Sequence, residues 1–235
     1  MLRAGGVRSR RGTDTDSRGF LLTSKIDKQL IAHQHRSALY MLLVTGEVSA
    51  VVPKLHITRE ARSRFRNLVG TGAPLIGVVH GSHAATRTWP AERFAEIACQ
   101  LSVDGRVVVF GADAERERTA MVAGDVAIDM GGRTDLPMLA AGLAECGMVV
   151  CNDSGPLHLA AAVGTPTASV WGAGNPAETG PPHGHMILRD ERLPCLECVK
   201  NVCPRQGKGT ILPGAHNECL HLIEVEDMIG AIRKQ

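Results

Sequence analysis

The chain has 235 residues, a net charge of +2, and 44% hydrophobic but only 3% aromatic residues. This length suits one large domain or one and a half smaller ones, and the core must be aliphatic. The nearly neutral body argues against a broad nucleic-acid-binding surface, and no apolar run is long enough to span a membrane.

The chain begins with two segments that carry few strand signals. Residues 1–19 are rich in arginine, glycine and serine and have no apolar stretch, so we predict a disordered basic leader rather than a secretory signal. Residues 20–73 are helix-rich and look like the remnant of a larger domain. Without a signal peptide, the odd count of seven cysteines indicates a reducing, cytoplasmic compartment.

From residue 74 onward, short apolar runs alternate with helical patterns, with a last helix over 225–234. This alternation predicts an α/β class with right-handed crossovers and a doubly wound parallel sheet over 74–235. Such sheets bind ligands at the carboxyl ends of their strands. The predicted strands are Leu75–Val79, Arg106–Phe110, Val126–Met130, Met148–Cys151 and Thr167–Trp171, and the predicted helices between them are Pro90–Leu101, Glu115–Ala123, Leu136–Glu145 and Pro156–Val163.

The fourth predicted strand runs into Asp153, Ser154 and Gly155, and a helix begins at Pro156. The first N–H groups of a helix lack internal partners and attract anions, and a glycine lets a phosphate approach the backbone. Ser154 adds a hydroxyl, whereas Asp153 would repel phosphate and is better suited to accept hydrogen bonds from sugar hydroxyls. His158, one turn later, points back over the same rim. The alternative is that Asp153 or Ser154 merely caps the helix.

The stretch from Asp153 to Thr167 resembles the signature of the ADP-heptose:lipopolysaccharide heptosyltransferase family, glycosyltransferase family 9. The resemblance covers 74–234 well and 33–70 loosely. It implies a GT-B fold of two Rossmann-like domains, with the donor held by the C-terminal one. It also implies an inverting transfer that needs no metal or other cofactor for catalysis.

Three further positions match the family. Arg87, in Arg87-Thr88-Trp89-Pro90, stands where a lysine of the family binds the donor phosphates, which implies donor binding and leaving-group stabilisation. Glu115 matches a glutamate that accepts from the ribose hydroxyls, and its alternative role is to complement a helix N-terminus. Thr134 matches a residue near the nucleotide base and is also a good helix cap. We expect Trp89 to be a packing residue.

A cysteine-rich segment spans 194–220, with Cys195, Cys198, Cys203 and Cys219 at spacings that suit a tetrahedral site. Four thiolates can hold structural zinc or bind iron, and they leave no open position for catalysis. Many members of the family carry a similar arrangement. The alternative is a set of reduced or disulfide-bonded thiols that fasten a loop.

The resemblance implies a glycosyltransferase that moves heptose, or a related sugar, from a nucleotide-diphospho-sugar such as ADP-heptose to a lipopolysaccharide-core or similar glycan. The family's catalytic base lies after the first strand of the N-terminal domain, and no segment before residue 74 matches it. The base is therefore unknown, and we predict a truncated N-terminal domain. A non-catalytic nucleotide-sugar-binding remnant and a nucleotide-sugar epimerase remain alternatives. We expect no nucleic-acid partner and no transmembrane segment, with peripheral contact at the inner membrane compatible with the acceptor.

Overall fold

The computed structural model describes residues 6–14, 17, 19–27, 34–49, 51, 53–181, 184–205, 208, 211–212 and 216–234. The chain divides into two compact units. The first comprises Met1–Val52 with Ala177–Thr179, and the second comprises Pro53–Pro176 with Gly180–Gln235. Every predicted site residue belongs to the second unit.

The first unit is small. Its elements are β1 (Arg11–Thr13), the 3-10 turn η1 (Gly19–Leu21), β2 (Ser24–Ile26) and α2 (Arg36–Thr45), and the short helix α8 (Pro176–Thr179) contributes its last three residues. β1 pairs in parallel with β2, which differs from the disordered leader expected over 1–19. The side chain of Arg10 accounts for part of this order, because its Nε donates to the carbonyl oxygen of Leu21 at 2.6 Å. Residues 1–5, 15, 16 and 18 of the leader lie outside the described residues.

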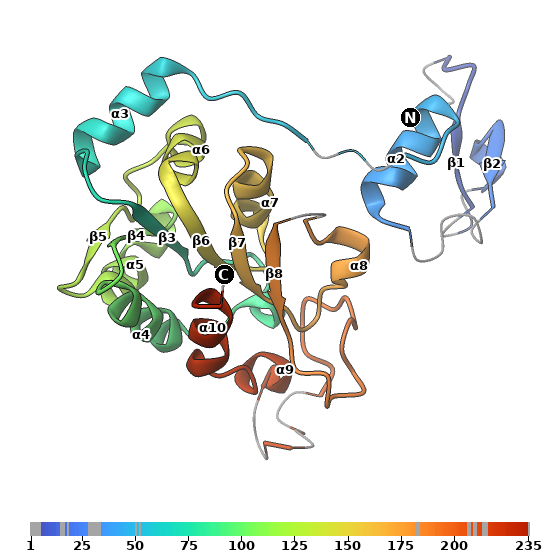
Figure 1. Ribbon diagram of the computed structural model, residues 1–235. Coiled ribbons are helices and arrows are strands. Elements are labelled where there is room, and N and C mark those ends of the chain that lie inside the picture. Colours follow the sequence, from blue (N-terminus) through green and yellow to red (C-terminus); the bar gives the residue numbers. More distant parts are fainter. Residues whose placement is uncertain are drawn as a thin grey trace. The chain divides into compact units, whose positions relative to one another are not determined.

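The second unit is built on one parallel sheet of six strands in the order β5-β4-β3-β6-β7-β8 (Figure 1). The strands are β3 (Leu75–Val79), β4 (Arg106–Phe110), β5 (Ala127–Asp129), β6 (Cys146–Asn152), β7 (Thr167–Val170) and β8 (His185–Leu188). The chain first builds outward from β3 to β5 and then returns to place β6 on the other side of β3. This reversal creates a switch point between β3 and β6, where open α/β sheets bind ligands.

The structure confirms the predicted doubly wound parallel sheet and its first five strands. The sixth strand, β8, was not expected. It pairs in parallel with β7. The stretch between β7 and β8 is rich in Gly and Pro and has no strong helical pattern, so the sequence did not indicate a crossover connection to another parallel strand. Its burial is only partial, so its sequence carries a weak strand signal.

Helices cover both faces of the sheet (Figure 1). One core cluster joins the sheet to α4 (Ala91–Leu101), α5 (Arg116–Ala123) and α10 (Val225–Ile232). The other joins it to α3 (Arg59–Val69), α6 (Leu136–Glu145) and α7 (Gly155–Ala162). The remaining elements of this unit are η2 (Ala85–Arg87), η3 (Asp113–Glu115) and α9 (Glu218–His221).

Helix α3 moves the expected domain boundary. We placed the boundary between residues 73 and 74, whereas the compact unit begins at Pro53. The reason is packing: Phe65 of α3 is fully buried and stacks on Phe110 of β4 with ring centroids 6.0 Å apart. At the same helix, Arg62 and Arg66 form ion pairs with Glu145 of α6.

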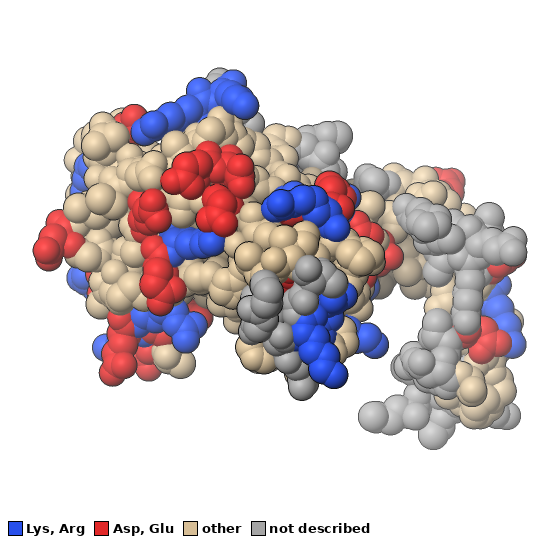
Figure 2. Space-filling view, turned by 90° about the horizontal axis from the view of Figure 1, so that it is seen from below, with Lys and Arg blue, Asp and Glu red and all other residues tan. Residues whose placement is uncertain are grey.

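The surface of the described residues offers two further observations. None of their helices combines the length and hydrophobicity that a bilayer span requires. On the face drawn in Figure 2, acidic and basic side chains are interspersed over the larger body.

Candidate functional site

A cavity of about 600 Å³ lies at the carboxyl ends of β3, β4, β5 and β6, on both sides of the switch point. Its walls combine apolar side chains with a few polar groups, as is typical of sites for small organic ligands. The lining residues are Val79, Gly81, Ser82, His83, Phe110, Gly111, Ala112, Ala114, Glu115, Thr134, Asp135, Leu136, Leu139, Ser154, Gly155 and Pro156. Four of the predicted donor-binding residues are therefore brought together: Glu115, Thr134, Ser154 and Gly155.

The turn from β6 into α7 contributes the N-terminus of a helix to this cavity. Ser154 is in the N-cap position, but its side chain forms no capping hydrogen bond. Its Oγ is buried and has no hydrogen-bond partner among the described residues. The structure therefore gives no support to the alternative that the Ser154 hydroxyl serves only as a cap.

The space beside the Cα of Gly155, at the start of helix α7, is open. A Cβ added there would meet no heavy atom within 4 Å, and the backbone φ lies outside the positive range. Neither a clash nor the backbone conformation explains the glycine, although alanine is preferred in helices by about 1 kcal/mol. The open space at Gly155 is available to a group that approaches the backbone closely.

Glu115 serves two purposes. One carboxylate oxygen accepts from the backbone N–H of Ala112 at 2.9 Å, which fixes the start of η3 and α5. The same side chain lines the cavity and lies against Gly81, where any Cβ would overlap its Oε1. The helix-terminus role and a position suited to ligand contact therefore coexist.

Asp135, and not Thr134, caps the helix α6, although both residues line the cavity. Asp135 caps α6, because its Oδ1 accepts from the N–H of Met138 at 2.8 Å. Arg64 donates to the other oxygen at 2.7 Å, and this hydrogen bond, followed by that from Met138, holds the pKa of Asp135 below its usual value. Thr134 lines the cavity without being the cap.

Arg87 and Asp153 form a pair beside this cavity, and neither they nor His158 line it. Arg87 Nε lies 3.4 Å from Asp153 Oδ2, and both atoms are buried without a hydrogen-bond partner among the described residues. Asp153 is only 5% exposed. Burial raises the pKa of its carboxyl, while the charges of Arg87 and then of His158 oppose that rise. Arg87 and Asp153 thus form an ion pair that is partly shielded from solvent and in which these two atoms are not hydrogen-bonded.

Asn152 fastens the loop that carries Arg87, a role that the sequence did not suggest. Its side chain is fully buried, accepts from the N–H of Trp89 at 2.9 Å and donates to the carbonyl oxygen of His80 at 2.7 Å. Trp89 is itself buried, and its Nε1 donates to the carbonyl oxygen of Ile223, which confirms its packing role. The partners of Asn152 are distant in sequence, so no local pattern could have revealed them.

His80 is a second residue that the sequence analysis missed. Its Nε2 lies 3.0 Å from the hydroxyl of Thr119, and that hydroxyl donates to the carbonyl oxygen of Glu115 at 2.8 Å. Burial lowers the pKa of His80, which favours a neutral ring that donates from Nε2. Through the Thr119 hydroxyl, His80 is thereby linked to the backbone of Glu115 at the start of α5.

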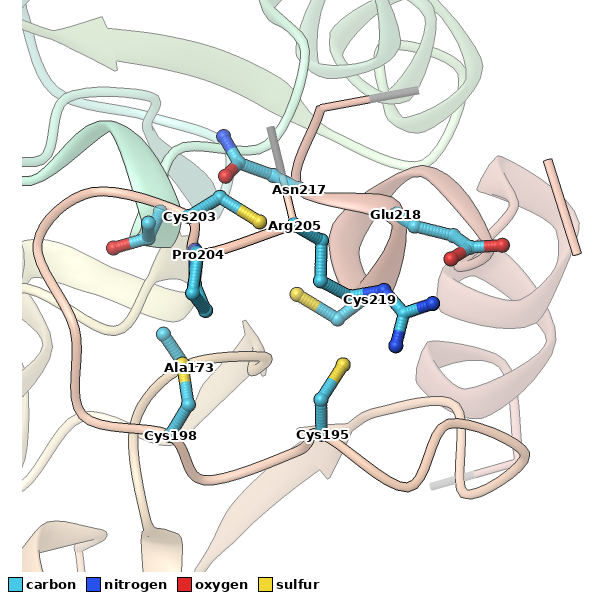
Figure 3. Close-up of a pocket in the computed structure, with 10 residues that line it drawn as sticks. Ala173, Cys195, Cys198, Cys203, Pro204, Arg205, Asn217, Glu218 and Cys219 are labelled. Atoms are coloured by element: carbon cyan, nitrogen blue, oxygen red, sulfur yellow. The ribbon is translucent and has the colours of Figure 1, made fainter. Parts of the chain in front are cut away.

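The four late cysteines meet at a second cavity, of about 20 Å³, that is also lined by Thr86 and Ala173. Figure 3 shows the sulfur atoms of Cys195, Cys203 and Cys219 pointing toward its interior. None of the chain's seven cysteines, all of which are described, is in a disulfide. Burial, and then the neighbouring thiols, raise the pKa of Cys219 to about 11. In the described part of the chain, no three His, Cys, Asp or Glu side chains are close enough to share a metal ion.

Comparison with known proteins identifies relatives over most of the chain. The model of glycosyltransferase family 9 (heptosyltransferase) matches residues 1–208. Lipooligosaccharide heptosyltransferase 2 of Campylobacter jejuni serotype O:6 is 21% identical over 221 residues, which cover 88% of this chain and 66% of that protein. Lipopolysaccharide heptosyltransferase 1 of Pseudomonas aeruginosa is 35% identical over 142 residues, which cover 57% of this chain and 39% of that protein. The chain thus spans less than two thirds of the length of these relatives.

Solved structures share the fold. The structure of Escherichia coli ADP-heptose lipopolysaccharide heptosyltransferase II has a TM-score of 0.75 at 22% identity, covering 99% of this chain and 71% of that one. The iron-containing dodecameric glycosyltransferase TibC of enterotoxigenic E. coli has a TM-score of 0.60 at 19% identity, covering 83% and 51%. These likenesses confirm the predicted Rossmann-like half of a GT-B fold.

Proposed function

The chain belongs to glycosyltransferase family 9, and from this premise we propose that it binds a nucleotide-diphospho-sugar, ADP-heptose, for the transfer of heptose to a lipopolysaccharide-core or similar glycan. One observation carries the proposal: Glu115, Thr134, Ser154 and Gly155, which come from three different loops, line a single cavity at the switch point of the sheet. This is the place where a doubly wound sheet receives a nucleotide.

The cavity suggests how the donor lies. Its apolar walls, which include Val79, Phe110 and Leu139, suit a nucleoside, with Thr134 toward the base and Glu115 accepting from the ribose hydroxyls. The diphosphate then reaches the first N–H groups of α7 beside the buried hydroxyl of Ser154. Helix N-termini favour anions because their N–H groups lack internal partners and carry partial positive charge.

The Arg87–Asp153 pair suits the reacting end of the donor. The acceptor hydroxyl attacks the anomeric carbon as the bond to the diphosphate breaks, and negative charge grows on the departing oxygen. The guanidinium of Arg87 and the α7 amides stabilise that charge. We assign to Asp153 the role of accepting hydrogen bonds from the sugar hydroxyls. His158, whose charge acts on Asp153, is proposed to contact the same part of the donor. The proposal assigns no residue of this chain as the general base.

We also propose that Cys195, Cys198, Cys203 and Cys219 hold a structural zinc or iron ion. The four thiols line one small cavity and are of the type that either metal accepts, and binding would draw them closer together than they lie in the structure. A bound cation would offset the mutual repulsion of thiolates that are brought together there. Elemental analysis of the purified chain should find about one metal per chain, and a metal-free, folded protein would contradict this role.

Isothermal titration of the purified 235-residue chain with ADP, GDP and UDP tests the donor site. We expect ADP to bind most tightly, since Thr134 and the apolar wall are proposed to hold adenine. Product analysis with ADP-heptose and a lipopolysaccharide-core acceptor then separates the alternatives. Heptose transfer supports a transferase, binding without turnover supports a non-catalytic role, and an isomerised donor supports an epimerase. A folded chain that binds none of the nucleotides would overturn the proposal.

The proposed acceptor also fixes where the reaction would occur. Lipopolysaccharide core is assembled on a lipid, so we propose that the chain acts at the cytoplasmic side of the inner membrane through peripheral contact. Cell fractionation with antibodies against the chain tests this location. Recovery from the periplasm would contradict it.

A further inference from the structure

The cysteine segment, defined as residues 194–205 together with 217–219, is fastened to the loop that follows β7. The N–H groups of Glu197 and Val199 donate to the carbonyl oxygens of Gly172 and Ala173 at 3.0 and 2.8 Å. Both donors have positive φ, 58° and 52°, which non-glycine residues adopt at a cost. The segment therefore holds a strained conformation in which both of these bonds form.

The same segment is fastened to η2, the turn that ends at Arg87. The hydroxyl of Thr86 donates to the carbonyl oxygen of Lys200 at 2.6 Å, and the side chain of Asn217 donates to the carbonyl oxygen of Ala85 at 2.9 Å. Thr86 is 3% exposed and lines the cysteine cavity. Two cross-links thus bind the two residues that immediately precede Arg87.

Close glycine contacts connect the cysteine segment to Asp153. A Cβ at Gly172 would overlap or crowd Cys219, and a Cβ at Gly174 would overlap Asp153 Oδ2. The loop after β7 is therefore packed between the cysteine segment and the carboxylate that pairs with Arg87. Each member of the Arg87–Asp153 pair has its own connection to the same cysteine segment.

We propose that Thr86 and Asn217 are positioning residues, through which the cysteine segment holds the Arg87 turn in place for the donor diphosphate. This inference rests on the proposed function, since it needs the Arg87 turn to contact the donor. The two side chains act through the backbone of the turn rather than on the ligand. Loss of these two side chains leaves Glu115 and Thr134, the residues proposed to contact the nucleoside, unaltered, so it weakens binding of the diphosphate without weakening binding of the nucleoside.

The test compares Thr86→Val and the double variant T86V/N217A with the wild type. Calorimetry measures ADP and adenosine affinity, and hydrogen exchange reports on residues 84–88. We expect the double variant to bind ADP about tenfold more weakly, because two cross-linking hydrogen bonds are lost. We also expect faster exchange over 84–88, with adenosine affinity unchanged.

Thr165→Val is the matched control. Thr165 is 4% exposed, and its hydroxyl also donates to a distant backbone carbonyl, that of Leu143, at 2.8 Å, but it lies before β7 and away from the cavity. Unchanged exchange over 84–88 in the double variant, or equal loss of ADP affinity in Thr165→Val, overturns the inference. Should Thr86→Val fail to fold, Asn217→Ala with the same two measurements decides it.

The failure of this inference is distinguishable from that of the proposed function. If the wild-type chain binds no nucleotide, the proposed function falls, and the diphosphate part of the inference falls with it. If the wild type binds ADP and the double variant binds it equally well, only the positioning role is refuted.

Discussion

The two sides of the candidate site are built in different ways. On the cavity side, Glu115, Thr134, Ser154 and Gly155 each follow closely after a strand of the sheet and line one cavity, with Glu115 and Thr134 at its proposed nucleoside end. On the ion-pair side, Arg87 lies farther along its loop and faces Asp153. The first side is placed by local chain geometry, whereas the second depends on hydrogen bonds from distant segments. The two sides should therefore respond separately to mutation.

The largest effect is expected from Arg87→Ala. Loss of charge-assisted contacts to a diphosphate, worth about 2–3 kcal/mol, should weaken ADP binding by about 30- to 150-fold. Adenosine binding should remain as in the wild type. Calorimetry with both ligands checks the difference.

Arg87→Lys is the conservative partner of this variant, since the family carries lysine at the matching position. It should keep most of the ADP affinity because it retains the charge, although it lacks the guanidinium fork. An equal loss in the alanine and lysine variants, or a comparable loss of adenosine binding, would show that the two sides are not separable.

Gly155→Ala should move stability and binding in opposite directions. The new methyl group meets no protein atom, so the helix gains up to about 1 kcal/mol and the melting temperature should stay the same or rise. The same methyl occupies the space proposed for the phosphate, and ADP affinity should fall by about tenfold. Thermal unfolding and calorimetry on one preparation test this, and unchanged affinity would remove Gly155 from the site.

Glu115→Gln should have a smaller effect at the nucleoside end of the cavity. The amide oxygen can still accept from Ala112, but a neutral group accepts more weakly from ribose hydroxyls, and we expect adenosine and ADP affinity to fall together by about three- to tenfold. Glu117→Gln on the exposed surface of α5 is the control and should change neither affinity. A loss confined to ADP would contradict the assignment of Glu115 to the ribose.

The smallest effect concerns the pH dependence of the ion-pair side. Burial raises the pKa of Asp153 above the ordinary value of an aspartate, so the folded protein holds this proton to higher pH than the unfolded chain does. The free energy of unfolding should therefore decrease as pH rises from the ordinary pKa through the raised one. Asp153→Asn should lack this component. Denaturant unfolding at several pH values compares the two, and parallel pH profiles would refute the effect.

Several features followed from the sequence because they depend on short-range patterns. Apolar runs and helix signals predicted five strands and the α/β class, and the Ser154–Gly155 turn was recognisable because a strand, a turn and a helix follow one another directly. Strand β8 was missed because its residues are only partly buried and because the sequence before it shows no strong helical pattern of the kind that usually connects parallel strands. The packing of helix α3 could not be predicted, because only the contact of Phe65 with Phe110 reveals where it lies.

The sequence by itself determined the parallel sheet, the turn from β6 into α7 and the polar residues that follow the strands, since each is encoded by neighbouring residues. Only the tertiary structure decided that four of these residues share one cavity and that Arg87 pairs with Asp153. It also decided that Asn152, Thr86 and Asn217 hold the intervening loops. The reason is physical: a buried hydrogen bond joins whichever groups packing brings together. When those groups are far apart along the chain, they produce no periodic pattern in the sequence.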